Sequence, residues 1–513
     1  MIAPTRHRYV QPAAILLAAL LFQLLRGYVF YTHDNSDRAL QVQITRNWMQ
    51  GHGWTEAYSD PTDRSRLHYR PNRAWPPGYS LLLASAYRLA GDWFRAIEWL
   101  DALGLVLLFA GLYALLLPLA DGSRAWWLLL PAWGLGFAPF GYLGSTDLWA
   151  AVGLVAMLAC LQRYSRPWHL LPAAACLLLA VSMRYAYYPF ALLLVVPLAG
   201  QRLRATHAAS LLAALLLAVG PVWAFQQGDG AYFDARPLRE TRAWLHPAQW
   251  LDADIFPLKT FIYLHPPKLA TLLHLPPGWT TALLWIPALL LLVAGCAGGY
   301  ALFRRHRATG LLLAATLLSN IGSLYALSLL VAAEQWGPDD YWTYVEESRY
   351  YLPAMLVFAV WLVAAWQTPT LPGRAAFRVL WSLVLLLGLT HAAGRYAAHL
   401  GGDQRLTRHS DYQAGLRWTY RYVEALSPVC YVYGDSYVWR EKQSVATWAG
   451  ASAVSLDSLL AHPWCTSRPL HVLIHLDDEA RATFAAHTHS DPTTWDTVAY
   501  WDGLPVCRWE ADP

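Results

Sequence analysis

Two carboxylates occur within four residues directly after the first apolar segment, in the run His33-Asp34-Asn35-Ser36-Asp37. A carboxylate in such a place can accept a proton as a general base or can bind a metal ion. The same residues also fit a structural role, because Ser36 or Asp37 could cap a helix that extends to Met49. Asp34 and Asp37 are therefore the first candidate catalytic residues.

A third acidic candidate, Asp147, follows Gly144-Ser145-Thr146 in a short polar turn between apolar segments. It is either a second functional carboxylate or the N-cap of the next helix. Arg184 interrupts another apolar segment, where a charge is costly enough to indicate function. The alternative for Arg184 is a side chain that extends to the membrane surface.

The elements around the first two carboxylates follow from the residue pattern. After Asp37, apolar positions recur at helical spacing as far as Met49, and Gly51-His52-Gly53 follows. This pattern predicts an amphipathic helix at the membrane surface that stops at the glycines. The rigid segment Arg70-Pro71-Asn72-Arg73-Ala74-Trp75-Pro76-Pro77-Gly78-Tyr79 then returns the chain to the membrane.

The composition excludes an ordinary soluble protein. Of the 513 residues, 56% are hydrophobic and 14% are charged, against about 25% charged in a typical globular protein. The mean hydropathy is +0.27, and the net charge of +4 is not gathered into the basic patch that a nucleic-acid-binding protein needs. The sequence predicts an α-helical polytopic membrane protein, with apolar runs at roughly 11–31, 76–90, 97–119, 125–143, 146–162, 167–200, 206–226, 279–302, 308–332, 349–366 and 377–392.

Short arginine-bearing connections predict the orientation, because the positive-inside rule assigns them to the cytoplasm. They contain Arg6, Arg8, Arg124, Arg163, Arg166, Arg202, Arg204, Arg304, Arg305, Arg307, Arg374 and Arg378. All of them lie inside if the run 76–90 does not cross by itself and the stretch 167–200 is broken near Arg184, which gives about eleven crossings. The N-terminal segment is then an uncleaved first helix.

Two regions follow from this topology. Residues 1–395 form the membrane module, whose outward loop spans residues 32–75, and residues 396–513 form a small α/β domain outside the cytoplasm. The loop, the turn at Asp147 and the segment 227–278 share that outer face. For a bacterial inner membrane the outer face is the periplasm, where nucleotide-activated donors are not available.

The C-terminal region carries its own signals. Val429–Tyr433 and His471–His475 are predicted strands, and a helix is predicted near Ala446–Leu460. Disulfides are permitted outside the cytoplasm, and an odd number of cysteines leaves at least one unpaired. The candidates for pairing are Cys430, Cys465 and Cys507.

Several motifs occur in the order known from one enzyme superfamily. They are an acidic residue after the first segment, an Arg46-Asn47 helix that ends in Gly51-His52-Gly53-Trp54, Pro76-Pro77-Gly78-Tyr79, Asp147, Arg184 and Glu347-Ser348-Arg349-Tyr350-Tyr351-Leu352-Pro353. Over about 350 residues the chain resembles the C-type glycosyltransferases, which use polyprenyl-phosphate-linked sugars. The resemblance is greatest to the aminoarabinose-transferase and protein O-mannosyltransferase-like branches. Many relatives have Asp-Glu where this chain has Asp37-Arg38.

The resemblance implies a membrane glycosyltransferase that moves a hexose or pentose from a polyprenyl phosphate to a periplasmic or surface lipid, glycan or protein, with inversion. It implies that a carboxylate, Asp37 or Asp34, is the general base. It also implies that Asp147 is a second acidic residue of the catalytic site. The substrate-binding residues would be Arg70, Arg73, Trp75, Arg184, Arg349 and Tyr350.

Two alternatives stay open. The first is a multi-pass transporter or lipid flippase, since broken helices and buried charges also suit transport. The second is a divalent metal held by Asp37, Asp147 and Glu347, although the resemblance implies no cofactor. Trp75 is a stacking surface for the sugar or a membrane-belt residue.

Overall fold

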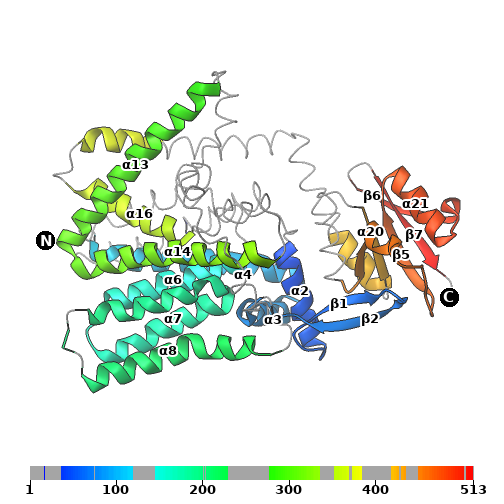
Figure 1. Ribbon diagram of the computed structural model, residues 1–513, viewed down its shortest axis with the longest axis horizontal. Coiled ribbons are helices and arrows are strands. Elements are labelled where there is room, and N and C mark those ends of the chain that lie inside the picture. The colour runs from blue at the N-terminus through cyan, green and yellow to red at the C-terminus, as the bar shows by residue number, and fades with distance from the viewer. Residues whose placement is uncertain are drawn as a thin grey trace, which may run out of the picture. The chain divides into compact units, whose positions relative to one another are not determined.

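The computed structural model separates the chain into two compact units (Figure 1). The first, the helical unit, contains Met1–Tyr31, Asp101–Phe225 and Phe233–Ala397. The second, the loop–sheet unit, contains Thr32–Leu100, Gln226–Tyr232 and Ala398–Pro513, so the outward loop shares a unit with the C-terminal residues. The structure describes residues 17, 36–73, 75–119, 145–199, 201–202, 204–228, 277–334, 352–368, 373–383, 417–426, 429–434, 449–501 and 504–511.

The helical unit is built from apolar helices. They are α4 (Trp93–Leu116), η1 (Leu117–Leu119), α6 (Ser145–Gln162), η2 (Pro167–His169), α7 (Leu170–Met183), η3 (Tyr185–Leu198), α8 (Ala205–Gln226), α13 (Pro277–Arg305), α14 (Arg307–Glu334) and α16 (Leu352–Gln367). In the described part of the chain, α4 and α8 are both long and apolar enough to cross a membrane. Both helices coincide with apolar runs predicted from the sequence.

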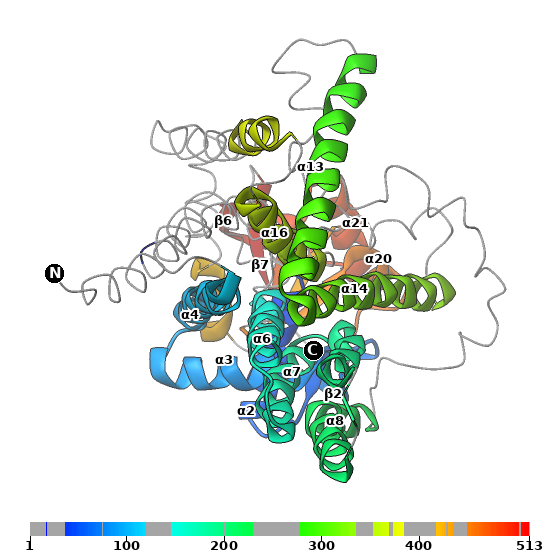
Figure 2. The ribbon, with the colours of Figure 1, turned by 90° about the vertical axis from the view of Figure 1, so that its left-hand side faces the viewer.

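Small residues bring the helices of this unit together, as is common in membranes. An ideal Cβ at Gly153 of α6 would lie 2.7 Å from the backbone of α7, at Cys176 O and Ala180 N. Gly104 and Gly111 of α4 similarly face Leu148 and Val155 of α6. Figures 1 and 2 show α6 and α7 side by side. Larger side chains at these glycines would push the helices apart.

The predicted break in the stretch 167–200 lies at Arg184. Helix α7 ends at Met183, Arg184 is extended with φ −148° and ψ 121°, and η3 begins at Tyr185. Pro189 inside η3 removes a backbone donor and disfavours a continuous α-helix. The sequence prediction of two short helices is confirmed here.

The loop–sheet unit begins with α2 (Ser36–Met49), the hairpin β1 (Thr55–Asp60) and β2 (Asp63–Pro71), and α3 (Pro77–Ala90). Helix α3 starts with a proline in its first turn and is capped at its C-terminal end by Gly91. The φ angle of Gly91 is 67°, which glycine adopts without the strain that other residues would have. Its 14 residues rise roughly 21 Å, which is less than the apolar thickness of a bilayer. The expectation that the run 76–90 does not cross by itself stays a prediction.

The C-terminal residues form a five-stranded mixed sheet with the order β4-β3-β5-β7-β6. Strand β3 is parallel to β4 and β5, whereas β7 is antiparallel to β5 and β6. The elements are β3 (Val429–Tyr433), β4 (Ser452–Ser455), α20 (Leu456–Leu460), β5 (Leu470–His475), α21 (Asp478–Thr488), η6 (Pro492–Thr494), β6 (Asp496–Trp501) and β7 (Leu504–Ala511).

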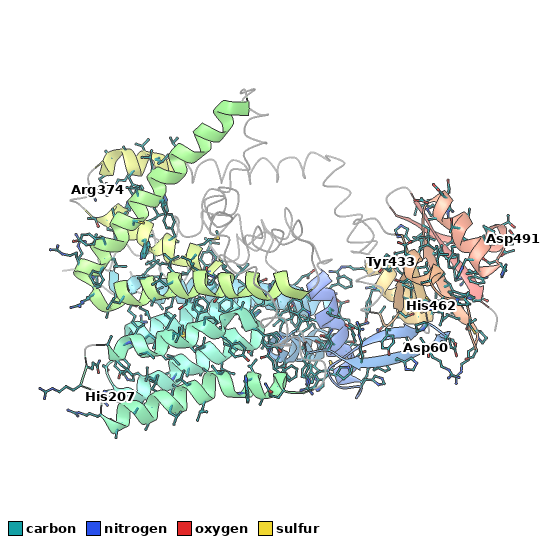
Figure 3. The ribbon with its side chains drawn as sticks, viewed as in Figure 1. Asp60, His207, Arg374, Tyr433, His462 and Asp491 are labelled. Carbon is teal, nitrogen blue, oxygen red and sulfur yellow. The ribbon has the colours of Figure 1, made fainter. Side chains whose placement is uncertain are left out.

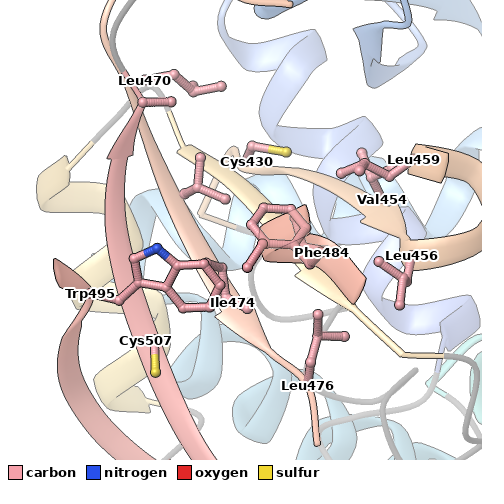
Figure 4. Packing of buried hydrophobic residues seen from close by; sticks show 14 residues of the cluster. Cys430, Val454, Leu456, Leu459, Leu470, Ile474, Leu476, Phe484, Trp495 and Cys507 are labelled. Carbon is pink, nitrogen blue, oxygen red and sulfur yellow. The ribbon is translucent and has the colours of Figure 1, made fainter. Parts of the chain in front are cut away.

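Strands β3 and β5 occupy their predicted positions, but the predicted helix near Ala446–Leu460 is wrong in its first part. Ser452–Ser455 is strand β4, because pairing with β3 outweighs local helix propensity. The helical part shortens to α20, where the Ser455 side chain accepts a hydrogen bond from Ser458 N. Figure 4 shows Phe484 and Trp495 in the apolar core of this sheet.

The three C-terminal cysteines are free in the structure. Cys430 and Cys507 are buried in the core shown in Figure 4, whereas Cys465 is exposed. Strand β5 separates β3 from β7, so the backbones carrying Cys430 and Cys507 are roughly 10 Å apart, beyond the reach of a disulfide. Burial raises the pKa of Cys430 to about 11 and keeps it protonated.

Candidate functional site

Asp37 lies in the first turn of α2, and Asp34 lies outside the described residues. The structure describes the backbone of Asp37 but not its side chain. Negative charge is favoured in the first turn of a helix, because the backbone N–H groups there lack partners within the helix. Asp37 therefore lies at a helix end that suits a carboxylate, and its role as a general base stays a prediction.

Helix α2 is fixed by buried polar contacts. Asn47 Nδ2 donates to Thr55 O over 2.8 Å, and Thr45 Oγ1 donates to Gln41 O over 2.6 Å. In the structure Gln41, Gln43, Thr45 and Asn47 of this helix are all buried, and α3 and β1 pack against it. Its predicted position at the membrane surface stays a prediction.

Arg70 lies on β2, directly opposite Glu56 on β1. Its Nε pairs with Glu56 Oε1, and Asn72 Nδ2 donates to Glu56 Oε2 over 2.6 Å. Its guanidinium also lies 5.7 Å from the centre of the Tyr58 ring. The side chain is nevertheless 69% exposed, so Arg70 has a cross-strand partner and remains open to solvent. Glu56 and Asn72 were not predicted from the sequence, because the contacts of Glu56 with Arg70 and with Asn72 depend on the hairpin register.

Arg73 and Trp75 follow the hairpin, and both are half-buried. A Cβ on Gly228 would overlap the Arg73 guanidinium, so the two residues are in direct contact. The chain near the C-terminal end of α8 thus covers Arg73. This contact connects residues that are far apart in the sequence, and the spacing of the motif alone could not reveal it.

Asp63 joins the hairpin to the C-terminal residues of the same unit. Its carboxylate accepts hydrogen bonds from Ser467 N over 3.0 Å and Ser467 Oγ over 2.5 Å, and from Ser65 Oγ over 2.6 Å. Arg64 N also donates to Cys465 O. Bonds from Ser467, and then from Ser65, hold the pKa of Asp63 well below its ordinary value of 3.8. These hydrogen bonds therefore join the hairpin to the C-terminal residues within one unit.

Asp147 and Arg184 form a buried, two-pronged ion pair in the helical unit. Arg184 Nε donates to Asp147 Oδ1 over 2.6 Å, and Arg184 Nη2 donates to Asp147 Oδ2 over 2.9 Å. Asp147 lies in the first turn of α6, and Arg184 occupies the break between α7 and η3. One edge of the Arg184 guanidinium, formed by Nε and Nη2, donates to both carboxylate oxygens of Asp147. A phosphate would therefore have to bind another edge of this guanidinium.

Arg349, Tyr350, Glu346 and Glu347 lie outside the described residues. Helix α16, which follows them, begins at Leu352 with Pro353 in its first turn. Asn320 of α14 supplies a cap from a neighbouring helix, because its Oδ1 accepts a hydrogen bond from Ala354 N over 3.1 Å. Asn320 was not among the residues predicted from the sequence. A buried amide in an apolar run was the available signal.

No group of three or more His, Cys, Asp or Glu side chains within the described ranges is arranged to hold a metal ion. Asp37, Asp147 and Glu347 had been considered as a metal-binding set. Of these three, the structure describes only the side chain of Asp147, and that side chain binds Arg184.

Comparison with known proteins identifies the fold. Neither a protein family nor a curated protein sequence matches the chain. The crystal structure of ArnT from Cupriavidus metallidurans bound to undecaprenyl phosphate matches with a TM-score of 0.54 and 14% identity, over 99% of this chain and 98% of that one. The apo form of the same protein matches with a TM-score of 0.55 and 12% identity, over 96% and 97% of the two chains. This chain therefore has the same fold as these two ArnT structures along nearly its whole length.

Proposed function

We propose that the protein is an integral-membrane glycosyltransferase that takes a sugar from a polyprenyl-phosphate carrier. The observation that carries the proposal is the fold match over nearly the whole of both chains, to a structure that holds undecaprenyl phosphate. The independent resemblance of the sequence motifs, in the same order along the chain, supports the same assignment. The acceptor is a lipid, glycan or protein side chain at the outer face.

The reaction is a single displacement at the anomeric carbon of the sugar. Asp37 takes the proton of the acceptor hydroxyl or amine, the acceptor bonds to the anomeric carbon, and the bond to the lipid phosphate oxygen breaks. The products are the glycosylated acceptor and the free polyprenyl phosphate, and the anomeric configuration is inverted. The position of Asp37 in the first turn of α2 supports this role, and Asp34 assists it.

The leaving phosphate requires cations that bind its oxygens in a fixed geometry. Arg349 is the main candidate, with Arg70 and Arg73 in support, while Tyr350 and Trp75 contact the sugar. The ion pair with Asp147 favours a positioning role for Arg184, namely to hold the break between α7 and η3. Asp147 would share that role instead of acting as a base.

The proposed topology follows the arginine distribution. The chain crosses a bacterial inner membrane about eleven times, and residues 32–75 and 396–513 lie outside the cytoplasm. The bonds between Asp63 and Ser467 support a common side for these two regions. A transporter or flippase is less favoured, because the whole chain matches the fold of a transferase.

The test is the product that the purified full-length protein forms from a labelled sugar. Polyprenyl-phosphate sugars are offered together with a membrane extract, and nucleotide sugars serve as the alternative donor. We expect label to move only from the lipid-linked donor into an acceptor of the extract. Transfer from a nucleotide sugar, or movement of the donor across vesicles without transfer, would contradict the proposal.

A further inference from the structure

A polar cleft of about 760 Å³ lies in the helical unit, between two of its connections. One connection joins α6 to α7 and contributes Ser165 and Trp168, and the other joins η3 to α8 and contributes Gln201, Arg202 and Arg204. The described lining contains no acidic side chain. The cleft is thus positively charged, and none of the residues assigned above to the transfer reaction is among its described lining residues.

The two arginines of the cleft are available to a ligand. Both are exposed, and among the residues that the structure describes neither has an ion-pair partner. The backbone N–H of Arg204 donates to His207 Nδ1 over 3.2 Å, so a neutral His207 carries its proton on Nε2. Figure 3 labels His207 close to the start of α8. The cleft therefore offers two guanidinium groups and an imidazole N–H, which together suit phosphate oxygens.

The position of the cleft along the helices indicates where this phosphate would come from. Arg202 and Arg204 immediately precede α8, which is long and apolar enough to cross a membrane. Trp168 is 54% exposed and rests edge-on against His169, with 4.2 Å between the ring centres. Exposed tryptophans and arginines at the end of a span lie at the level of the lipid headgroups. A lipid headgroup is therefore the nearest source of phosphate.

We propose that this cleft binds the phosphodiester headgroup of an anionic membrane lipid. Arg202 and Arg204 bind the phosphate, while Ser165, Gln201 and His207 supply neutral hydrogen-bonding groups. The positive-inside rule assigns this face to the cytoplasm, opposite to the face of the proposed transfer reaction, so the site does not depend on that reaction. A zwitterionic lipid would bring an ammonium group close to the arginines and would bind less well.

The chain contains a matched control for this proposal. Arg305 and Arg307 have the same spacing as Arg202 and Arg204 and are also exposed. They are the last residue of α13 and the first residue of α14, outside the cleft. The variant Arg202→Gln/Arg204→Gln is compared with Arg305→Gln/Arg307→Gln, so that both lose two charges. Native mass spectrometry of the full-length protein in detergent measures binding of phosphatidylglycerol, phosphatidylcholine and inorganic phosphate.

We expect the wild-type protein to bind phosphatidylglycerol in preference to phosphatidylcholine. The cleft variant should bind phosphatidylglycerol about ten-fold more weakly or worse, because it loses charge-assisted hydrogen bonds to phosphate, and the control variant should bind as the wild type does. The variant Arg202→Lys/Arg204→Lys keeps the charge but loses the paired N–H groups of the guanidinium. Its affinity for phosphatidylglycerol should lie between those of the wild type and the Gln variant.

Three results would overturn the proposal. Equal weakening in both Gln variants would show that general surface charge attracts the lipid. Equal binding of the two phospholipids would show that the cleft does not select anionic headgroups. Arginine-dependent binding of inorganic phosphate without binding of phosphatidylglycerol would assign the cleft to a soluble phosphate.

Discussion

At the scale of single residues, the ion pair between Asp147 and Arg184 connects the start of α6 to the break before η3. The sequence identified both residues as unusual, because each places a charge next to apolar segments. It could not show that they bind each other, since they are 37 positions apart and each had a separate explanation. The contact favours a positioning role over two independent roles in substrate binding.

Removing one partner should leave a buried charge without compensation. We expect Asp147→Asn or Arg184→Gln to lower the free energy of unfolding by about 3 to 5 kcal/mol, whereas the double variant should lose less than the sum. Chemical denaturation in detergent measures these losses, and Arg305→Gln, which changes an exposed arginine outside the cleft, is the control. Additive losses would mean that the pair contributes no coupling.

Substitution of Arg349 tests its proposed role in binding the lipid phosphate. Arg349→Lys should lower turnover by about ten-fold or more, because lysine cannot replace the two-pronged geometry and one lost charge-assisted hydrogen bond is worth about 1.5 to 3 kcal/mol. Arg349→Ala should also weaken donor affinity. If these variants lost thermal stability while the folded fraction kept its activity, Arg349 would be only an ion-pair partner of Glu346 or Glu347.

At the scale of elements, the sequence predicted the helices well and the polar outward loop poorly. The glycines after Met49 indicated where α2 ends, and the run Val429–Tyr433 indicated β3. Strands β1 and β2 were not predicted, because their charged residues hide the alternation of a strand. Asp60-Pro61-Thr62 was the available turn signal, and Asp502-Gly503 was the corresponding signal between β6 and β7.

The contact between the hairpin and the C-terminal residues depends on the side chain of Asp63. Asp63→Ala removes the hydrogen bonds to Ser467, so hydrogen exchange at the Ser467 amide should become about ten-fold faster or more. Asp60→Ala is the control, because Asp60, labelled in Figure 3, bonds only to Thr62 and His68 within the hairpin in the described structure. Equal effects of the two substitutions would contradict this role.

The same contact predicts a pH dependence. Hydrogen bonds from Ser467 and Ser65 lower the pKa of Asp63, so the folded state favours the ionised carboxylate. Its contribution to stability is fully present above the unfolded pKa of about 3.9, and it is lost as the pH falls toward the lower folded value. Protection of the Ser467 amide in the wild-type protein should therefore decrease below about pH 4, and it should not do so in Asp63→Ala.

At the scale of the whole molecule, the loop–sheet unit contains three separate segments of the chain, Thr32–Leu100, Gln226–Tyr232 and Ala398–Pro513. Arg417 Nη2 donates to Glu98 Oε1 over 2.9 Å, and its guanidinium lies 4.9 Å from the centre of the Phe94 ring. Composition and hydropathy predicted which segments leave the membrane, because those properties are local. They could not predict that segments more than 300 residues apart pack together, because such packing depends on complementary surfaces.

The topology predicts which side each segment occupies. In a cysteine-free background, Thr62→Cys and Ala482→Cys, both at exposed positions, should react with a membrane-impermeant thiol reagent added outside intact cells. Arg305→Cys should react only after the cells are opened. Labelling of Arg305→Cys in intact cells, with protection of the other two positions, would invert the topology and remove the argument for a lipid-linked donor.

The most direct test of the central claim is the rate at which purified protein transfers a labelled sugar from polyprenyl phosphate, compared between the wild type, Asp37→Asn and Asp34→Asn. Loss of a general base typically costs about 100-fold or more, so Asp37→Asn should fall to background while it still binds the donor lipid, and Asp34→Asn should keep a measurable part of the rate. Near-native transfer by both variants would contradict the assignment of the base to the outward loop.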